Sequence, residues 1–192
     1  MTQFIILPGS GGSGASHWQT HWEQANPAMR RFQPSSWTDP DFQDWLNALD
    51  TAVALASEPP ILVAHSLSCL VIAHWQKAAA LPVKGAFLVA VPDPTAPIFP
   101  HGGTEFSEAF ERPLRFPSVI LASGDDPYGS LAYAQKKANE WGSELKTVGP
   151  LGHINGRSGL GGWPEGAKLL ADFVQRIERP EDATPNPIEP VI

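Results

Sequence analysis

The sequence predicts a doubly wound α/β fold, in which helices cover both faces of a compact, mainly parallel sheet of about six strands. Short apolar runs alternate along the chain with longer segments whose apolar residues recur at roughly helical spacing. The short runs are continuously apolar, which indicates strands buried on both faces, as in a parallel sheet between two helical layers. With 192 residues, the chain is long enough for one domain with a sizeable core.

Each expected strand is a short apolar run bounded by turn residues or by a helical segment. The expected strands span residues 4–7, 30–33, 61–64, 85–91, 118–122 and 144–148. The segments between and after them have the apolar spacing of helices. The expected helices span residues 17–25, 41–56, 68–80, 131–141 and 163–177. Strands and helices therefore interleave, which is the order that a doubly wound sheet requires.

Two segments depart from this alternation. Residues 93–117 contain five prolines and two adjacent glycines, and a connection of this length without regular structure suggests a partial lid over a site. Residues 179–192 contain four prolines and little apolar content, so we expect an extended or disordered tail. The remaining chain, residues 1–178, is expected to form a single domain.

The composition narrows the classes of partner. The net charge of −7 argues against nucleic acid and anionic membrane surfaces, because both are bound through basic patches. No apolar run approaches the length of about 18 residues that predicts a membrane span. The first residues lack the basic region and cleavage site of a signal peptide, and the one cysteine, Cys69, excludes an internal disulfide. These features predict a cytoplasmic protein. We expect it to act on a small molecule, as a monomer or as a homodimer.

A serine lies where a predicted strand meets a predicted helix. In the segment AHSLSC, Ser66 follows the strand over residues 61–64 and precedes the helix over residues 68–80. Ligands bind at the carboxyl ends of parallel strands, and a sharp strand-to-helix turn there would present the hydroxyl as a nucleophile. Such a turn usually has glycine two residues before and two after the serine, where this chain has Ala64 and Ser68. The alternative is that Ser66 is only the N-cap of the helix.

A candidate acid and a candidate base follow in the order that serine chemistry uses in this fold class, which is serine, acid, histidine. The fifth strand ends in ASGDDPY and the sixth in VGPLGHIN. His153 is the candidate base. Asp126 is preferred to Asp125 as the acid, because Pro127 biases Asp126 to an extended backbone. Asp125 is left to cap the next helix.

The other five histidines are weaker candidates. His65 adjoins the candidate nucleophile, with its side chain expected to point away, and His74 lies within the following helix. His101 lies in the proline-rich segment, where we expect it to touch substrate. His17 and His21 are four residues apart in a predicted helix, which suits a metal pair, but no third ligand is evident. Neither a metal ion nor another cofactor is therefore expected.

The negative charge that develops on an attacked carbonyl needs two backbone N–H donors. One is expected from Leu67, the residue after the candidate nucleophile. The other is expected from Ser10, in the glycine-rich loop PGSGGSG after the first strand. A phosphate-binding role for this loop is disfavoured, because its glycines do not form G-x-G-x-x-G with an acid at a following strand end, and no G-K-[ST] follows.

These segments resemble the small α/β-hydrolases of the retinoblastoma-binding protein 9 and YdeN type. The resemblance is carried by LPGSGGSGASHWQTHWE, AHSLSC, SGDDPY and GHINGRSGLGGWPEG, and it extends from residue 4 to about residue 177. It implies an α/β-hydrolase fold with little or no cap, and it places the nucleophile at Ser66, the acid at Asp126 and the base at His153. Positions 64 and 68 depart from the glycines that many α/β-hydrolases carry. The family itself does not fix a substrate.

Together these residues predict a carboxylesterase-like serine hydrolase that cleaves a small ester through an acyl-enzyme, with a Ser-His-Asp triad. The aromatic residues Trp18, Phe99, Phe106 and Trp163 indicate a modestly apolar acyl group. Trp18, His101 and Trp163 are the expected substrate contacts. The competing hypothesis is a binding protein that keeps the hydrolase fold without useful turnover, with which the missing glycines at the turn and the proline-rich tail are compatible.

Overall fold

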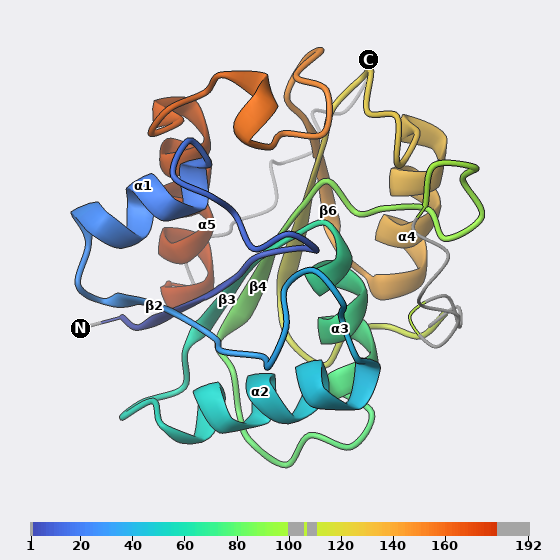
Figure 1. Ribbon diagram of the computed structural model, residues 1–192. Helices are drawn as coiled ribbons and strands as arrows, with labels where there is room; N and C mark the ends of the chain where they lie inside the picture. Colours follow the sequence, from blue (N-terminus) through green and yellow to red (C-terminus); the bar gives the residue numbers. More distant parts are fainter. Residues whose placement is uncertain (1, 100–105, 107–110, 180–192) are drawn as a thin grey trace, which may run out of the picture.

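The computed structural model describes residues 2–99, 106 and 111–179, with a six-stranded parallel sheet at its centre (Figure 1). The strands are β1 (Phe4–Leu7), β2 (Met29–Arg31), β3 (Ile61–His65), β4 (Gly85–Val89), β5 (Ser118–Ala122) and β6 (Glu144–Thr147). Their order is β2-β1-β3-β4-β5-β6, and every neighbouring pair is parallel. The chain therefore runs from β1 to one edge of the sheet and returns to β3 before it continues to the other edge. This is the doubly wound topology that the sequence predicts.

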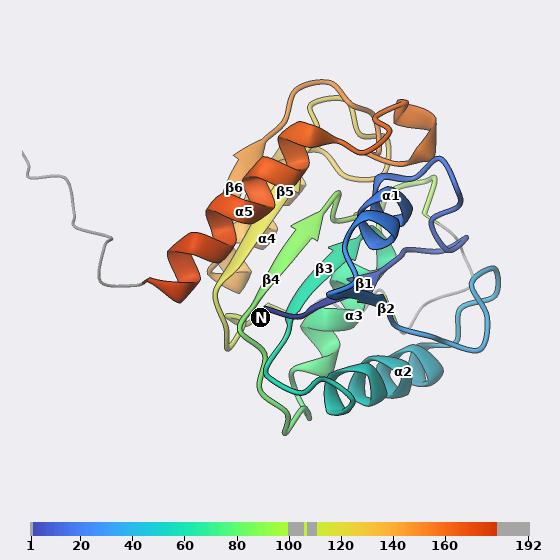
Figure 2. The ribbon, with the colours of Figure 1, turned by 90° about the vertical axis from the view of Figure 1, so that its left-hand side faces the viewer.

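Helices cover both faces of the sheet (Figure 2). One layer contains α1 (Trp18–Ala25) and α5 (Pro164–Glu178), and the other contains α2 (Phe42–Ala54), α3 (Leu67–Trp75) and α4 (Leu131–Trp141). A short 3₁₀-helix, η2 (Gly156–Ser158), lies between β6 and α5 in the chain. No helix within the described ranges is long and apolar enough to cross a membrane.

Two apolar cores, one on each face of the sheet, explain why the central strands are continuously apolar. Along β3, Ile61 and Val63 pack with residues of α1 and α5, whereas Leu62 and Ala64 pack with residues of α2, α3 and α4. Every residue of β3, β4 and β5 is buried. The edge strands β2 and β6 are partly exposed, which is why they contain charged residues. The helical layers thus supply the two-sided burial that the apolar runs predicted.

Several elements end at other residues than the sequence predicts. α3 ends at Trp75 rather than at residue 80, because the N–H groups of Lys77 and Ala78 bond to carbonyls only three residues back. β4 ends at Val89 rather than at residue 91, because Ala90 has a φ of 56°, which lies outside the strand region. Both chain segments turn earlier than their apolar composition indicates.

Three predictions lie wholly or partly outside the described residues. The expected tail over residues 179–192 lies there apart from Arg179, and His101 lies there as well. Of the expected lid over residues 93–117, the structure describes 93–99, 106 and 111–117. Phe99 and Phe106 in this segment are buried and belong to the core formed with α2, α3 and α4.

A buried glutamine joins the first turn of α1 to the sheet. Gln19 is 0% exposed, and its Nε2 donates to the carbonyls of Leu7 in β1 and Val63 in β3. Its Oε1 accepts from the hydroxyl of Ser13, in the loop after β1. The side chain of Gln19 therefore donates a hydrogen bond to each of two strands and also holds the loop that follows the first strand.

Replacing Gln19 by leucine removes the donor to both carbonyls at similar volume. We expect Gln19→Leu to lower the free energy of unfolding by about 1–3 kcal/mol, because a buried polar group without its partner retains its desolvation cost. Urea unfolding followed by tryptophan fluorescence measures the change. The matched control is Gln135→Leu on the exposed side of α4, which should change the free energy by less than about 0.5 kcal/mol. Equal effects of the two variants would contradict the prediction.

Candidate active site

The turn between β3 and α3 consists of one residue, Ser66. Its backbone has a φ of 54° and a ψ of −124°, a conformation that L-residues rarely adopt. Its N–H donates to the carbonyl of Val89, at the end of β4. Ser66 is the N-cap residue of α3, but its side chain makes no capping hydrogen bond, so capping does not explain the serine at this position. The turn instead holds the hydroxyl at the carboxyl edge of the sheet.

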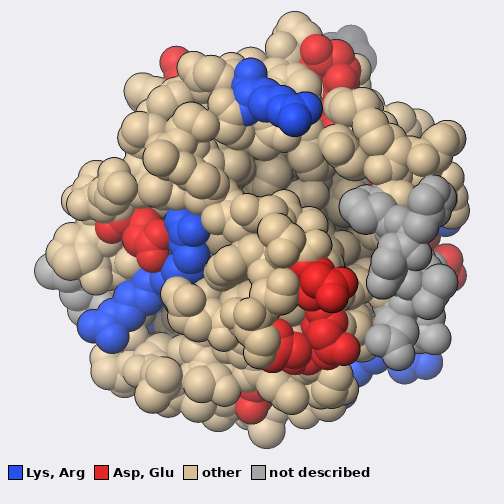
Figure 3. Space-filling model, viewed as in Figure 1, with Lys and Arg blue, Asp and Glu red and all other residues tan. Residues whose placement is uncertain are grey.

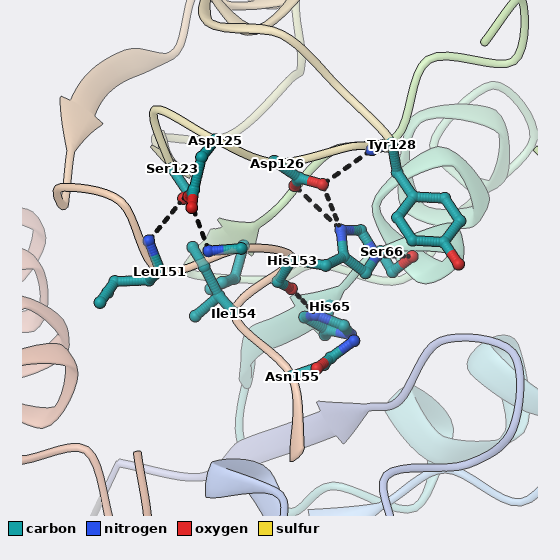
Figure 4. Close-up of polar contacts among 12 residues, drawn as sticks. His65, Ser66, Ser123, Asp125, Asp126, Tyr128, Leu151, His153, Ile154 and Asn155 are labelled. Atoms are coloured by element: carbon teal, nitrogen blue, oxygen red, sulfur yellow. Dashed lines mark hydrogen bonds and ion pairs between the residues drawn. The ribbon is translucent and has the colours of Figure 1, made fainter. Parts of the chain in front are cut away.

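His153 joins Ser66 to Asp126 (Figure 4). Nε2 of His153 lies 2.7 Å from Ser66 Oγ, and Nδ1 lies 2.9 Å from both carboxylate oxygens of Asp126. An ionised carboxylate only accepts, so Nδ1 carries a proton and Nε2 of the neutral ring accepts from the Ser66 hydroxyl. Asp126 also accepts from the N–H of Tyr128. The three residues that the sequence singles out thus form one continuous hydrogen-bonded series.

The neighbouring Asp125 holds the loop that carries the histidine. Its Oδ1 accepts from the Ser123 hydroxyl and from the Gly152 N–H, and Ser123 Oγ accepts from the Leu151 N–H. These hydrogen bonds, first of all the one from Ser123, lower the pKa of the Asp125 carboxyl. The expectation that Asp125 caps the next helix is wrong, because Ser130 is the N-cap of α4. The sequence does not reveal this brace, because the N–H groups of Leu151 and Gly152 come from a loop more than 25 residues further along the chain.

Two further histidines lie near His153. The Nε2–H of His65 donates to the backbone carbonyl of His153, and the two ring centroids are 5.0 Å apart. Burial holds the pKa of His65 well below its ordinary value, and the positive charges that His153 and His17 can carry lower it further. The His17 ring lies 4.8 Å from that of His65. Burial, followed by the charges of Arg31 and His153, lowers the pKa of His17 to about 4. His17 and His65 are therefore neutral neighbours of His153 near neutral pH.

His17 serves as a helix cap rather than as half of a metal pair with His21. Its Nδ1 accepts from the Gln19 N–H at the start of α1. Among the residues that the structure describes, no group of three or more His, Cys, Asp or Glu is placed to hold a metal ion. The cap gives His17 a role that does not involve His21.

A cleft of about 400 Å³ opens beside Ser66. One set of lining residues is apolar or aromatic, and comprises Leu67, Pro40, Pro92, Phe99, Phe106 and Tyr128. Another set is polar, and comprises Ser10, Ser13, His17, Thr38, Asp39 and Asn155. Among the described lining residues, Asp39 is the only carboxylate and neither lysine nor arginine is present. In the space-filling view, uncharged residues form most of the surface around the central hollow (Figure 3).

Two of the expected substrate contacts do not reach this cleft. Trp18 and Trp163 are 1% and 2% exposed, and their rings pack against each other between the sheet, α1 and α5. Trp18 Nε1 donates to the carbonyl of Ile154, next to the candidate base. The expectation that these tryptophans touch substrate is therefore wrong, because they are core residues. Phe99 and Phe106 line the cleft and give it apolar surface, which suits the apolar acyl group that the sequence predicts for the substrate.

The loop after β1 packs directly on the turn at Ser66. A Cβ on Gly9 would lie 2.9 Å from Ser66 Cβ and 3.1 Å from the carbonyl oxygen of His65, so only glycine fits without a shift. This contact brings the loop and the start of α3 together at the cleft. Ser10 and Leu67, the residues expected to supply two N–H donors, both line it.

The chain is similar in sequence and in structure to known hydrolases. A family model described as "Serine hydrolase" matches residues 4–172. A solved structure described as a YdeN-like hydrolase from Pectobacterium atrosepticum is 32% identical, with 92% of each chain covered and a TM-score of 0.83. The ydeN gene product from B. subtilis is 20% identical, with 91% of this chain and 100% of that chain covered and a TM-score of 0.72. The esterase domain of a Rhodothermus marinus protein is 17% identical and shares the fold, with coverages of 92% and 87% and a TM-score of 0.65. A search of the curated proteins found no match.

The low pKa of His17 predicts a pH-dependent contribution to stability. Folded His17 stays neutral down to about pH 4, whereas in the unfolded chain it takes up a proton below about pH 6.5. The unfolded state binds more protons in this window, so the free energy of unfolding falls as the pH drops from about 6.5 towards about 4. His17→Asn keeps a capping oxygen for α1 but does not titrate.

We therefore expect the loss of stability between pH 7 and pH 5 to be smaller in His17→Asn than in the wild type, by on the order of 1–2 kcal/mol. Urea unfolding at the two pH values gives the difference. His21→Asn, at a partly exposed position of the same helix, is the control and should leave the pH dependence unchanged. An identical pH dependence in His17→Asn and the wild type would refute the prediction.

Proposed function

Because the chain belongs to the serine hydrolase family of the YdeN type, we propose that it hydrolyses a small, uncharged ester through an acyl-enzyme on Ser66. The observation that carries the proposal is the hydrogen-bonded series from Asp126 through His153 to Ser66. A serine hydroxyl is a weak nucleophile unless a base takes its proton and a third group orients that base. The series supplies both groups within 2.9 Å.

In the proposed reaction, Ser66 Oγ attacks the acyl carbon while Nε2 of His153 takes the hydroxyl proton. Asp126 keeps the proton of the ring on Nδ1 and stabilises the imidazolium. Nε2 then gives its proton to the departing alcohol oxygen, which leaves Ser66 acylated. Water, deprotonated by the same Nε2, attacks the acyl-enzyme, and the proton returns to Ser66 Oγ as the acid leaves. The enzyme ends each cycle in its starting protonation state.

We assign the oxyanion hole to the N–H groups of Ser10 and Leu67. Leu67 is the first residue of α3, so its N–H has no partner within the helix, and a helix N-terminus favours negative charge. Ser10 follows Gly9, whose backbone packs against Ser66. Both donors therefore come from backbone that adjoins the nucleophile.

The lining of the cleft supports a short acyl group without charge. Its volume of about 400 Å³ suits a small substrate, and Phe99 and Phe106 offer apolar contacts. Asp39 would repel a carboxylate or phosphate, and none of the described lining residues is a lysine or arginine that would attract one. The proposed chemistry uses no metal ion or organic cofactor, and we place it in the cytoplasm, as the sequence predicts.

The wild-type chain is expected to react with a fluorophosphonate probe and to hydrolyse 4-nitrophenyl butyrate faster than the anionic 4-nitrophenyl hemiglutarate. Ser66→Ala should abolish the labelling and lower kcat/KM by at least ~10³-fold, because it removes the covalent route. Mass spectrometry of the labelled chain and steady-state kinetics measure the two effects. Labelling that persists in Ser66→Ala would contradict the assignment of the nucleophile. A folded wild type that neither reacts nor hydrolyses the esters would favour the competing hypothesis of a binding protein.

The two adjacent aspartates are expected to differ in their effect on turnover. Asp126→Asn removes the carboxylate that accepts from Nδ1 and permits the wrong imidazole tautomer, which should lower kcat by up to ~10⁴-fold. Asp125→Asn keeps an oxygen that accepts from Ser123 and Gly152, so its effect should be far smaller. Steady-state kinetics with 4-nitrophenyl butyrate compares the variants. A reversed order would identify Asp125 as the acid.

A further inference from the structure

We propose that Ser68 is a positioning residue that keeps the two halves of the oxyanion hole aligned, an inference that rests on the proposed function. Ser68 stands where the strand-to-helix turn of many α/β-hydrolases has glycine. It is 0% exposed, and its hydroxyl donates to the carbonyl of Pro8, 2.6 Å away. This hydrogen bond joins the first turn of α3 to the loop after β1.

The two proposed oxyanion donors belong to separate elements, so another contact has to hold these elements in a fixed relative position. Leu67 opens α3, and Ser10 lies in the loop after β1. Both N–H groups stabilise an oxyanion only if they point at one position, and a displacement of about 1 Å is enough to weaken catalysis strongly. Ser68 directly follows Leu67, and Pro8 lies shortly before Ser10 in the chain. The hydrogen bond between Ser68 and Pro8 therefore acts on both donors at close range.

The contact of Gly9 with Ser66 does not supply this alignment alone. It is van der Waals contact, which limits distance but does not set direction. The loop continues through Gly11 and Gly12, whose N–H groups donate to the carbonyls of Trp37 and Gly9, so neither of these hydrogen bonds reaches α3. Pro8 has no N–H, so its carbonyl is the one polar backbone group that it offers. A directional hydrogen bond to that carbonyl fixes how the loop approaches α3.

A purely structural serine would change stability without changing the transition state, and the chain offers a matched example. Ser118 is 7% exposed, and its hydroxyl forms a 2.7 Å hydrogen bond with that of Ser143. Ser118 is the first residue of β5, whereas Ser66 follows the last residue of β3. Ser68 and Ser118 are thus both buried and hydrogen-bonded, but Ser118 bonds to another side chain and lies at the opposite end of the parallel sheet from Ser66.

Ser68→Ala is expected to lower kcat for 4-nitrophenyl butyrate about 10-fold while KM changes by less than about 2-fold, because a misaligned donor acts on the transition state. The affinity for 1-butaneboronic acid, which forms a tetrahedral adduct with the active serine, should fall by a similar factor. Ser68→Thr retains the hydroxyl and should recover most of both losses. Ser118→Ala should lower Tm about as much as Ser68→Ala and leave kcat and boronic acid affinity unchanged.

If Ser68→Ala lowers Tm but leaves kcat and boronic acid affinity at the wild-type values, Ser68 is structural and the inference is overturned. If Ser68→Ala does not fold, Ser68→Gly, with the residue that is usual at this turn, supplies the same comparison. A wild type that neither reacts with the fluorophosphonate nor hydrolyses the ester overturns the proposed function and this inference with it. An active wild type with equally active Ser68 variants overturns this inference alone.

Discussion

The single-residue turn at Ser66 is the constraint on which the rest of the site depends. With β3 ending at His65 and α3 starting at Leu67, the strand and helix backbones meet at one residue with a φ of 54°. The loop after β1 has to come close to this turn, which requires Gly9 to carry no side chain. The same turn presents the hydroxyl and the N-terminus of α3 at the carboxyl edge of the sheet. In a parallel sheet, the segments after β5 and β6 begin at that edge too, so a carboxylate and an imidazole can meet the serine there.

The electrostatics of the site depend on keeping the neighbouring imidazoles uncharged. His65 lies 5.0 Å from His153 between ring centroids, and a second positive charge at that distance would oppose the imidazolium by about 3 kcal/mol at an effective dielectric constant of about 20. Burial prevents this, because it lowers the pKa of both His65 and His17. His65 can then donate to the His153 carbonyl without adding charge. Of the three rings, only that of His153 is paired with a carboxylate, namely Asp126.

Sequence reasoning predicted those features that have a local physical cause. Continuous apolar runs predicted the strands because both faces are covered. Pro127 favoured Asp126, and the structure places the carboxylate of Asp126 beside Nδ1 of His153. Features that depend on contacts between distant segments were not predictable. An aromatic side chain such as Trp18 suits a core as well as a cleft wall, and only the packing of α1 on the sheet decides between them. The same holds for the brace at Asp125, whose partners come from two different loops.

Ala64 and Ser68 stand at the turn where many α/β-hydrolases have glycine, and the closest approach of the loop after β1 to this turn lies at Ser66 instead. Ala64 is fully buried, and its methyl group packs into the core with α2, α3 and α4. The side chain of Ser68 reaches the loop after β1 instead of the strand, and its hydroxyl bonds to Pro8. The contact that excludes a Cβ lies at Gly9, in that same loop. A turn of this kind needs small residues wherever its neighbours approach it. The glycine of the facing loop leaves room for the turn at Ser66 itself, whereas the side chain at position 68 gains a hydrogen bond that glycine cannot make.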